Sequence, residues 1–499
     1  MSDMKAKLSL VKEFKIGDVD PNIFSSFIEQ LGRAVYTGIY EPGHPTADSQ
    51  GLRGDVMNLV KDLKVSLVRY PGGNFLSGYD WKDGIGPKEK RPVRLDRAWH
   101  TIETNEFGID EFVDWAKKSG TQVLAAVNMG TGTPQDAGDM VEYCNYPSGT
   151  YWSDLRIANG HKEPHNIKYW CVGNEMDGPW QICHLDAVDY GKKSLETMKI
   201  MKWTDDSIKT VVCGSATTDI PTYPEWDRIV LEHTYDYADY ISIHRYYENF
   251  GNDDDFLASF YDMDAFIKTS TATCDYVKAY KRSSKTMMLS FDEWNIWYQQ
   301  NQKPHPWERA PRLLEDKYSL LDALAFGGLA ITLLNHADRV KVACLAQLVN
   351  VIAPIFAEPG KGAYRQTIYW PFRDISLYGR GVSLQPVVTS DKKITDKYGE
   401  VPAVIFASVY NEEKKEISVF ALNTSKTENS ETTIDLRSFS NTKMIMRTEL
   451  TGSDLSAQNS LENPDRVAPA KVELSEGDSG IYTLCLKKAS WNVIRFSAE

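Results

Sequence analysis

The sequence has no apolar run approaching the roughly 20 residues that a membrane-spanning helix needs. Its N-terminus, MSDMKAKLSLVKEFKIGD, is charged throughout and lacks the apolar core and cleavage site of a secretory signal peptide. An excess of basic residues is also missing: the formal net charge is -13, whereas nucleic acids and anionic membranes are bound by basic surfaces. We therefore expect a cytoplasmic protein that binds neither nucleic acid nor membrane.

Paired cysteines are missing as well. The seven cysteines are scattered, odd in number and contain no CxxC pair, so the sequence predicts neither a disulfide framework nor a zinc site. Reduced, mostly buried thiols are the expected state. We expect no metal and no cofactor.

Aromatic residues are the one unusual part of the composition, with 13 Trp and 26 Tyr. Aromatic faces stack on the apolar faces of sugar rings, but they also fill protein cores, so this observation alone selects no function. The length of 499 residues exceeds what one hydrophobic core usually supports and favours two domains.

Short apolar runs alternate with helical stretches from about residue 20 to 350. The predicted strands cover residues 22–29, 65–71, 122–128, 167–175, 210–216, 240–246, 286–294 and 340–347. Most are nearly continuous in Val, Ile and Leu, as parallel strands buried on both faces are. Eight such strands predict a (β/α)₈ barrel; an open, doubly wound sheet is the alternative, although no strand is followed by G-x-G-x-x-G.

Helices are predicted over 108–120, which ends in Gly120, and over the apolar stretch 315–337. From about residue 385 the pattern changes to short alternating strands separated by turn residues, which predicts a β-sandwich. The predicted strands of this region cover residues 403–410, 415–423, 432–436, 443–450, 471–477 and 480–488. The alternating segment 7–16 is predicted to add a strand to it. The expected domains are thus an N-terminal strand (1–18), a barrel (19–384) and a C-terminal sandwich (385–499).

Polar and aromatic side chains gather where the predicted barrel strands end. In a (β/α)₈ barrel the active site lies at the carboxyl ends of the strands. The residues there, in strand order, are Glu29, Arg69, Asn74, Asn128, Asn174, Glu175, Ser215, His244, Tyr246, Asp292, Glu293 and Gln347. A barrel with only a structural role would not need this set, so the pattern predicts an active site.

Glu175 and Glu293 are the strongest catalytic candidates, because each ends a buried apolar run whereas most of the 69 acidic residues would lie on solvated loops. Glycoside hydrolysis needs one carboxyl group to protonate the departing oxygen and a second to attack or to activate water. The fourth and seventh strands face each other across a narrow barrel. The two glutamates could therefore meet at the roughly 5–5.5 Å separation of a retaining enzyme.

Several motifs carry a resemblance to a known family. FIEQLGRAVYTGIY, LVRYPGGNF, RPVRLDRAWHTIETNEFG, YWCVGNEMDGPWQ, ISIHRYY, FDEWNIWY, LLEDKYSLLDAL and AQLVNVIAPI run in order between about residues 24 and 354. Together they resemble the α-L-arabinofuranosidases of glycoside hydrolase family 51. GNEMDGPWQ and DEWNIWY are specific in combination, whereas PGGN alone would be weak.

The resemblance implies roles for individual residues. Glu175 corresponds to the catalytic acid/base and Glu293 to the nucleophile. Asn174 would bind the hydroxyl group beside the anomeric carbon. Arg69 would lie beside the nucleophile, and Tyr246 would donate a hydrogen bond to it.

The remaining substrate-binding residues follow from the same resemblance. Glu29, Asn74 and Gln347 would hold the other hydroxyl groups of a furanose ring, and Trp99 and Trp297 would form walls of the sugar subsites. Trp297 could instead be barrel packing.

Strand alternation puts His244 on the same face as Tyr246 and Tyr247 on the opposite one. We count His244 with the substrate-binding residues, the alternative being a core histidine whose hydrogen bonds are satisfied. Three residues depart from the family pattern: Gln30 in place of His, Cys183 in place of Gly, and Arg245 where an uncharged residue such as Gln is expected. Of these, Arg245 could alter the rim of the pocket.

The expected function is therefore that of a retaining, exo-acting α-L-arabinofuranosidase that releases arabinofuranose from arabinoxylan or arabinan oligosaccharides. An endo-β-glucanase or β-xylosidase on the same barrel is an alternative, and a non-catalytic carbohydrate-binding protein is a third possibility. The resemblance also implies a homo-oligomer, namely a hexamer.

Overall fold

Eight parallel strands close into a barrel in the computed structural model, which describes residues 4–299 and 306–498. In chain order they are β3 (Ser25–Phe27), β4 (Leu67–Tyr70), β7 (Gln122–Val127), β8 (Tyr169–Val172), β9 (Lys209–Cys213), β10 (Tyr240–Tyr247), β11 (Met288–Ile296) and β12 (Val340–Ala346). Each overlaps its predicted stretch, and β12 pairs with β3 to complete the ring. The (β/α)₈ prediction is confirmed, and the doubly wound alternative is wrong.

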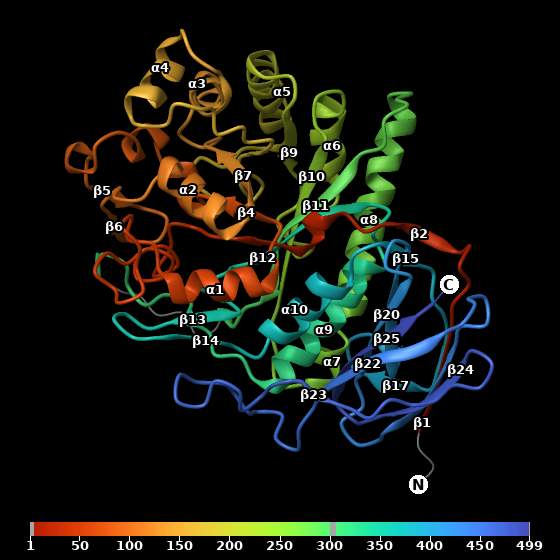
Figure 1. Ribbon diagram of the computed structural model, residues 1–499. Coiled ribbons are helices and arrows are strands. Elements are labelled where there is room, and N and C mark those ends of the chain that lie inside the picture. The colour runs from red at the N-terminus through yellow and green to blue at the C-terminus, as the bar shows by residue number, and fades with distance from the viewer. Residues whose placement is uncertain (1–3, 300–305, 499) are drawn as a thin grey trace.

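Helices surround the barrel (Figure 1). They are α1 (Gly54–Leu63), α2 (Ile109–Ser119), α3 (Pro134–Asn145), α4 (Tyr151–Ala158), α5 (Ala187–Thr204), α6 (Glu225–Thr234), α7 (Asp253–Leu257), α8 (Phe260–Tyr280), α9 (Leu320–Leu334) and α10 (Tyr369–Tyr378). The helix predicted over 108–120 is α2. It ends where Gly120 takes a left-handed φ of 78°, which costs glycine no steric strain.

Two sheets pack face to face in the C-terminal region. In spatial order the larger contains β2 (Lys15–Asp18), β15 (Val382–Leu384), β19 (Val404–Asn411), β20 (Glu416–Asn423), β25 (Ser490–Ser497), β22 (Lys443–Leu450) and β23 (Ala470–Lys471), and the smaller contains β16 (Val387–Ser390), β1 (Met4–Ser9), β21 (Ser430–Asp435) and β24 (Ile481–Leu486). Inward side chains of both sheets, such as Leu8 and Val419, form a core of their own. The predicted β-sandwich is confirmed.

The N-terminal segment supplies one strand to each of these sheets, so β1 and β2 lie beside the C-terminal strands in Figure 1. The sequence predicted a single strand over 7–16. A turn at Lys12 and Glu13, closed by the Phe14 amide donating to the Val11 carbonyl (3.0 Å), divides it in two.

Two details of the sandwich differ from the sequence prediction. The stretch 471–477 contributes only Lys471 to the two-residue strand β23, and β25 was not predicted although it lies between β20 and β22 in the larger sheet. Polar residues interrupt the apolar pattern of β25: Asn492 bonds to Ser490, and Arg495 pairs with Glu416. Ser490 lies on the same strand, and Glu416 lies on the neighbouring strand β20. The sequence alone does not show these partners, so the strand pattern of β25 was weak.

Helix α9 is apolar on every side because it lies between the barrel and the sandwich. All residues from Leu320 to Leu334 are buried, and a side chain at Gly327 would collide with Trp491 of β25. A helix covered all round is typically apolar all round. It begins at Leu320 rather than 315, because Ser319 caps it by accepting from the Asp322 amide.

Short elements fill the long loops. They are the hairpins β5 (Arg94–Asp96) with β6 (Thr101–Glu103), β13 (Ile355–Ala357) with β14 (Ala363–Arg365) and β17 (Lys392–Thr395) with β18 (Gly399–Pro402), and the 3₁₀ turns Pro21–Phe24, Asn74–Gly78, Trp81–Gly84 and Lys88–Lys90. Within residues 4–299 and 306–498, no helix has the length and apolarity needed to cross a membrane.

Candidate active site

Glu175 lies just beyond the end of β8. The strand stops at Val172 rather than continuing to 175 as predicted, because Gly173 (φ 93°) and Glu175 (φ 43°) turn the chain. A left-handed conformation costs a residue other than glycine about 1–3 kcal/mol and persists only where its surroundings hold it. Here Trp180 Nε1 donates to Glu175 Oε2 (2.6 Å), and His244 Nδ1 lies 2.9 Å from Oε1.

Glu293 belongs to β11, where an irregularity changes which way side chains point. Ser242 of β10 pairs with Ser290 of β11, and His244 of β10 pairs with Glu293 of β11. Between these two pairs β10 advances by two residues and β11 by three. The extra residue is a β-bulge, and bulges redirect side chains. As a result Asp292 and Glu293, which regular alternation would send to opposite faces, both contact Arg69.

Arg69, at the end of β4, links the two sides of the site. Its Nη1 donates to Glu293 Oε1 (2.6 Å) and its Nη2 to Asn174 Oδ1 (2.7 Å), while Nε lies 3.7 Å from Asp292 Oδ2. Burial alone would raise the pKa of Asp292, but the Arg69 and His244 charges lower that pKa to about 2. Asp292 is therefore a permanent anion behind Glu293.

His244 lies between three carboxylates. Its Nδ1 is 2.9 Å from Glu175 and 3.7 Å from Glu293 Oε2, and its Nε2 is 3.2 Å from Asp292 Oδ1. Burial alone would lower the pKa of His244, yet Glu293, Asp292 and Glu175 raise that pKa to about 10. His244 is buried, and the carboxylates that its two ring nitrogens contact include both candidate catalytic glutamates.

The shared contacts of His244 bring the two glutamates together. One carboxylate oxygen of Glu175 and one of Glu293 lie within 4.8 Å of each other and of a His244 nitrogen. An inverting glycosidase keeps its carboxyl groups about 6.5–9.5 Å apart, so the observed approach fits the retaining geometry.

Tyr246 completes the surroundings of Glu293. Its hydroxyl donates to Glu293 Oε2 (2.7 Å), and its ring meets the half-buried ring of Trp297 edge-on at 5.0 Å. Tyr247 lies on the opposite face, as alternation predicted, beside the Arg245 guanidinium.

A second cluster centres on Glu29. The amide of Phe75 (2.9 Å) and Trp99 Nε1 (2.8 Å) both donate to Glu29 Oε1, and Gln347 Oε1 accepts from the Glu29 amide (2.9 Å). Burial raises the pKa of Glu29 to about 8 against the effect of these donors, so the carboxyl group is mainly neutral at pH 7. Asn74 begins the adjoining 3₁₀ turn and is half-buried.

The structure therefore groups the predicted residues in two sets. Glu175, Glu293, Arg69, Asn174, His244 and Tyr246 form one connected network that Trp297 joins, and Glu29, Gln347 and Trp99 form another. Asn74 joins neither through a side-chain hydrogen bond to a described residue.

The sequence prediction missed one functional candidate, Trp180, and placed another, Asp292, at the strand ends without giving it a role. Trp180, in the quoted GNEMDGPWQ motif, holds Glu175, and about half of its surface is exposed. Asp292, also quoted in a motif, is fully buried and bonds to Ser242 (2.5 Å). A charged residue directly beside a candidate nucleophile in a buried strand was the signal that could have identified Asp292.

The three departures from the family pattern lie outside this network. Gln30 donates to the Phe107 carbonyl (2.7 Å). Cys183 has a left-handed φ of 57°, a conformation that favours the expected glycine. Arg245 bonds Asp262 (2.9 Å) and Thr217 (2.9 Å) on the side away from the glutamates.

A large cavity of about 1340 Å³ adjoins the site. Trp99 and Tyr298 line it together with residues 312–317 and a loop of the sandwich at 455–458. Of the predicted site residues only Trp99, which bonds to Glu29, borders it, so neither Glu175 nor Glu293 lines this cavity.

Glycoside hydrolases act through a pair of acidic residues at this spacing. Here the pair lies at the carboxyl ends of barrel strands, so the fold and the site together assign the protein to that class. Family models narrow the class: the alpha-L-arabinofuranosidase 1 domain matches residues 59–265 and the alpha-L-arabinofuranosidase C-terminal domain matches residues 292–490. The chain belongs to the α-L-arabinofuranosidases of glycoside hydrolase family 51.

Individual relatives extend over the whole chain. An intracellular exo-alpha-(1->5)-L-arabinofuranosidase of Halalkalibacterium halodurans is 53% identical and covers 99% of this chain and 100% of its own length. One from Bacillus subtilis is 51% identical, with 99% of each chain covered. Among solved structures, a family 51 alpha-L-arabinofuranosidase of Bifidobacterium longum is 42% identical with a TM-score of 0.96, covering 99% of this chain and 100% of its own.

Proposed function

We propose that the enzyme is a retaining, exo-acting α-L-arabinofuranosidase in which Glu293 is the nucleophile and Glu175 the acid/base. The observation that carries the proposal is the approach of their carboxylate oxygens to within 4.8 Å, which leaves no room for the water that an inverting mechanism places between them.

The contacts of each glutamate suit its role. Arg69 and Tyr246 donate to the two oxygens of Glu293, which orients the carboxylate for attack. Glu293 would attack the anomeric carbon while Glu175 protonates the departing oxygen, giving a glycosyl-enzyme. Glu175 would then take a proton from water as that water attacks, which releases the sugar with net retention.

The remaining polar groups suit recognition of one terminal sugar. Asn174, Glu29, Gln347 and Asn74 come from the ends of different strands or the turns that follow, and they would bind the ring hydroxyls. Trp99 and Trp297 would wall the subsite. A site that hydrogen-bonds each hydroxyl rejects sugars with a missing or misplaced one, because buried polar groups are then left unpaired.

The names of the relatives guide the choice of substrate. Several are called intracellular exo-alpha-(1->5)-L-arabinofuranosidases. We infer that this enzyme likewise acts inside the cell and releases L-arabinofuranose from α-1,5-linked arabino-oligosaccharides or from arabinoxylan fragments. We also infer a homo-oligomer, a hexamer, which sedimentation velocity would test.

The decisive experiment compares Glu293→Ala and Glu175→Ala with Glu413→Ala, an exposed control in the sandwich. Glu293→Ala should abolish turnover on every substrate, and a slow fluorosugar should label Glu293 covalently. Glu175→Ala should lose far more activity on an oligosaccharide than on a nitrophenyl glycoside, with rescue by azide, because a poor leaving group depends most on protonation. Labelling of another carboxylate, or equal losses on both substrates without rescue, would reject the assignment.

Product analysis separates the proposal from the other sugars. Arabino-oligosaccharides should yield single L-arabinose units, with the retained anomer seen first by NMR. Cello-oligosaccharides released from a mixed β-glucan, or preferred hydrolysis of nitrophenyl xyloside, would favour the endo-β-glucanase or β-xylosidase alternatives instead.

A further inference from the structure

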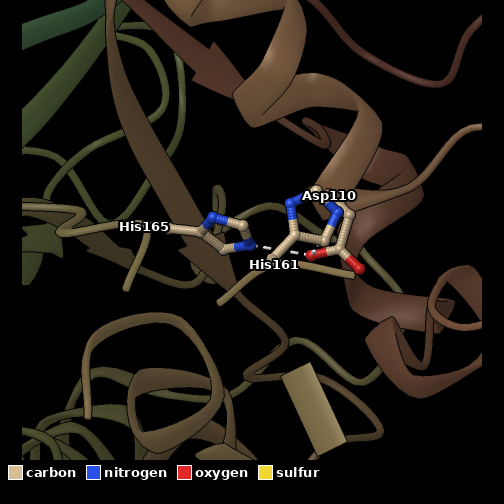
Figure 2. Close-up of side chains that lie close together, drawn as sticks. All are labelled: Asp110, His161 and His165. Carbon is tan, nitrogen blue, oxygen red and sulfur yellow. Dashed lines mark hydrogen bonds and ion pairs between the residues drawn. The ribbon is translucent and has the colours of Figure 1, made fainter. Parts of the chain in front are cut away.

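Two histidines and an aspartate converge at a place distinct from the candidate active site. Asp110 lies in the first turn of α2, and His161 and His165 lie in the segment that joins α4 to β8. His165 Nε2 is 2.7 Å from Asp110 Oδ1, and His161 Nε2 is 4.0 Å from the same oxygen. Figure 2 shows the His165 ring facing this carboxylate, with His161 beside it.

Asp110 is a buried carboxylate without a permanent countercharge. Among the residues that the structure describes, it contacts the Tyr143 hydroxyl (2.7 Å) and the two imidazoles, and no Lys or Arg pairs with it. An imidazole supplies positive charge only when it is protonated. Since an uncompensated buried charge is costly, a bound cation would stabilise this arrangement.

We propose that Asp110, His161 and His165 form a binding site for a divalent transition-metal ion, with Zn²⁺ as the best fit. Imidazole nitrogens and a carboxylate oxygen are a donor set that Zn²⁺ accepts, and one ligand atom from each residue lies within 4.8 Å of the others. Tetrahedral Zn²⁺ holds its ligand atoms about 3.3 Å apart. The His165–Asp110 contact must therefore open by about 0.6 Å and His161 must approach by about 0.7 Å.

Neighbouring contacts already orient these ligands. The Tyr143 hydroxyl occupies Asp110 Oδ2 and leaves Oδ1 for the ion, and Asn159 Nδ2 in turn donates to that hydroxyl (3.0 Å). Arg156 Nε donates to the His161 carbonyl (3.1 Å), which holds the segment against α4. Such outer contacts are what fix ligand geometry in metal sites.

The surroundings also allow access and set the affinity. The His161 side chain is 20% exposed, so an ion can enter and keep water as a fourth ligand. Within the described residues His165 Nδ1 is buried without a hydrogen-bond partner, and metal at Nε2 leaves the ring proton there. A missing acceptor of this kind weakens metal binding about 10–100-fold, so we expect micromolar rather than nanomolar affinity.

The ion would join α2 to the segment leading into β8, so its effect falls on stability rather than on the catalytic step. Ligand binding to the folded state raises Tm as the ligand concentration exceeds Kd. In the described parts of the chain, none of the three residues shares a hydrogen bond or ion pair with the two glutamates or their partners.

The test is Zn²⁺ titration of the metal-free enzyme by calorimetry, together with Tm and the visible spectrum of the Co²⁺ adduct. The variant is His161→Ala, and the matched control is His233→Ala, a half-buried histidine of α6. Glu293→Gln controls for the other converging group, Glu175 with His244 and Glu293. His161→Gln repeats the test in case the alanine variant folds poorly.

We expect one equivalent of Zn²⁺ to bind the wild type, His233→Ala and Glu293→Gln, to raise Tm, and to give the intense Co²⁺ absorption of a tetrahedral site. Binding should weaken at least about tenfold in both His161 variants, with activity unchanged without metal. Equal binding in the His161 variants, loss only in Glu293→Gln, or no binding to the wild type would overturn the proposal.

Discussion

Replacing Glu29 by Gln tests whether this carboxyl group is neutral when the enzyme works. Burial raises the pKa of Glu29 to about 8. The Phe75 amide and Trp99 Nε1 donate to Oε1 at 2.9 and 2.8 Å, whereas Oε2 has only the long contact from Gln347 Nε2 (3.4 Å), so the proton belongs on Oε2. A glutamine can put its carbonyl at the first position and its NH₂ group at the second. The amide therefore copies the neutral acid and cannot ionise.

The magnitude follows from the two pKa values. In the unfolded chain the carboxyl group titrates at 4.5, whereas in the folded protein burial raises the pKa of Glu29 to about 8. Between these values the unfolded state has lost a proton that the folded state keeps, so wild-type stability falls as pH rises and levels off above pH 8. Keeping Glu29 protonated in the folded state lowers the free energy of unfolding of the wild type by about 1 kcal/mol at pH 5 and by about 4 kcal/mol at pH 8. Between pH 5 and pH 8 the free energy of unfolding of Glu29→Gln should therefore rise by about 3 kcal/mol relative to that of the wild type.

Calorimetric Tm values between pH 5 and pH 8 measure this difference, with the exposed Glu413→Gln as the control. The Tm of Glu29→Gln minus that of the wild type should rise with pH, while the control stays level. KM should be similar in both enzymes at low pH and should rise above pH 8 only in the wild type. A Tm difference that is independent of pH would mean that Glu29 is ionised throughout, and the reasoning would fail.

Three further substitutions test other contacts. Cys183→Gly should raise the free energy of unfolding by about 1 kcal/mol, because glycine takes the φ of 57° without strain, whereas Cys183→Ser should not; urea unfolding decides. Arg245→Gln should cost about 1–3 kcal/mol of stability but leave kcat/KM within about twofold, and a changed aglycone preference would contradict this. Burial lowers the pKa of His244, but Glu293, Asp292 and Glu175 together raise it to about 10. Asp292→Asn removes one of these charges, so the pKa of His244 should fall. The ring ¹⁵N signal of His244 should then titrate between about pH 6 and pH 9, unlike that of the wild type.

The barrel could be predicted from the sequence because its strands are buried on both faces. The run 123–127 is continuously apolar, and that signal is local. Strand β25 could not be found in the same way, since Arg495 is satisfied by Glu416 of a neighbouring strand. The start of α9 was placed too early because Glu315, Asp316 and Lys317 are residues that a first helical turn would also accept, and only the Ser319 cap defines the boundary.

The site was predictable as a set of residues but not as a geometry. Motifs identified Glu175, Glu293 and Arg69, and the structure brings these three into one network. The bulge that turns Asp292 toward the same network depends on how β11 pairs with its neighbours, which periodicity within one strand cannot reveal. Trp180 was missed for a similar reason, because its contact with Glu175 depends on a left-handed turn.

The two strands of the N-terminal segment have a consequence for the order in which the chain can be made. The Lys5 amide bonds the side chain of Asp391, which follows 386 positions later, and β1 pairs with β21 later still. At a translation rate of roughly 5–20 residues per second, β1 waits roughly 20–80 s for its first partner. The barrel is synthesised in full during that interval, so β1 takes its place in the sandwich only after the whole barrel sequence has been made.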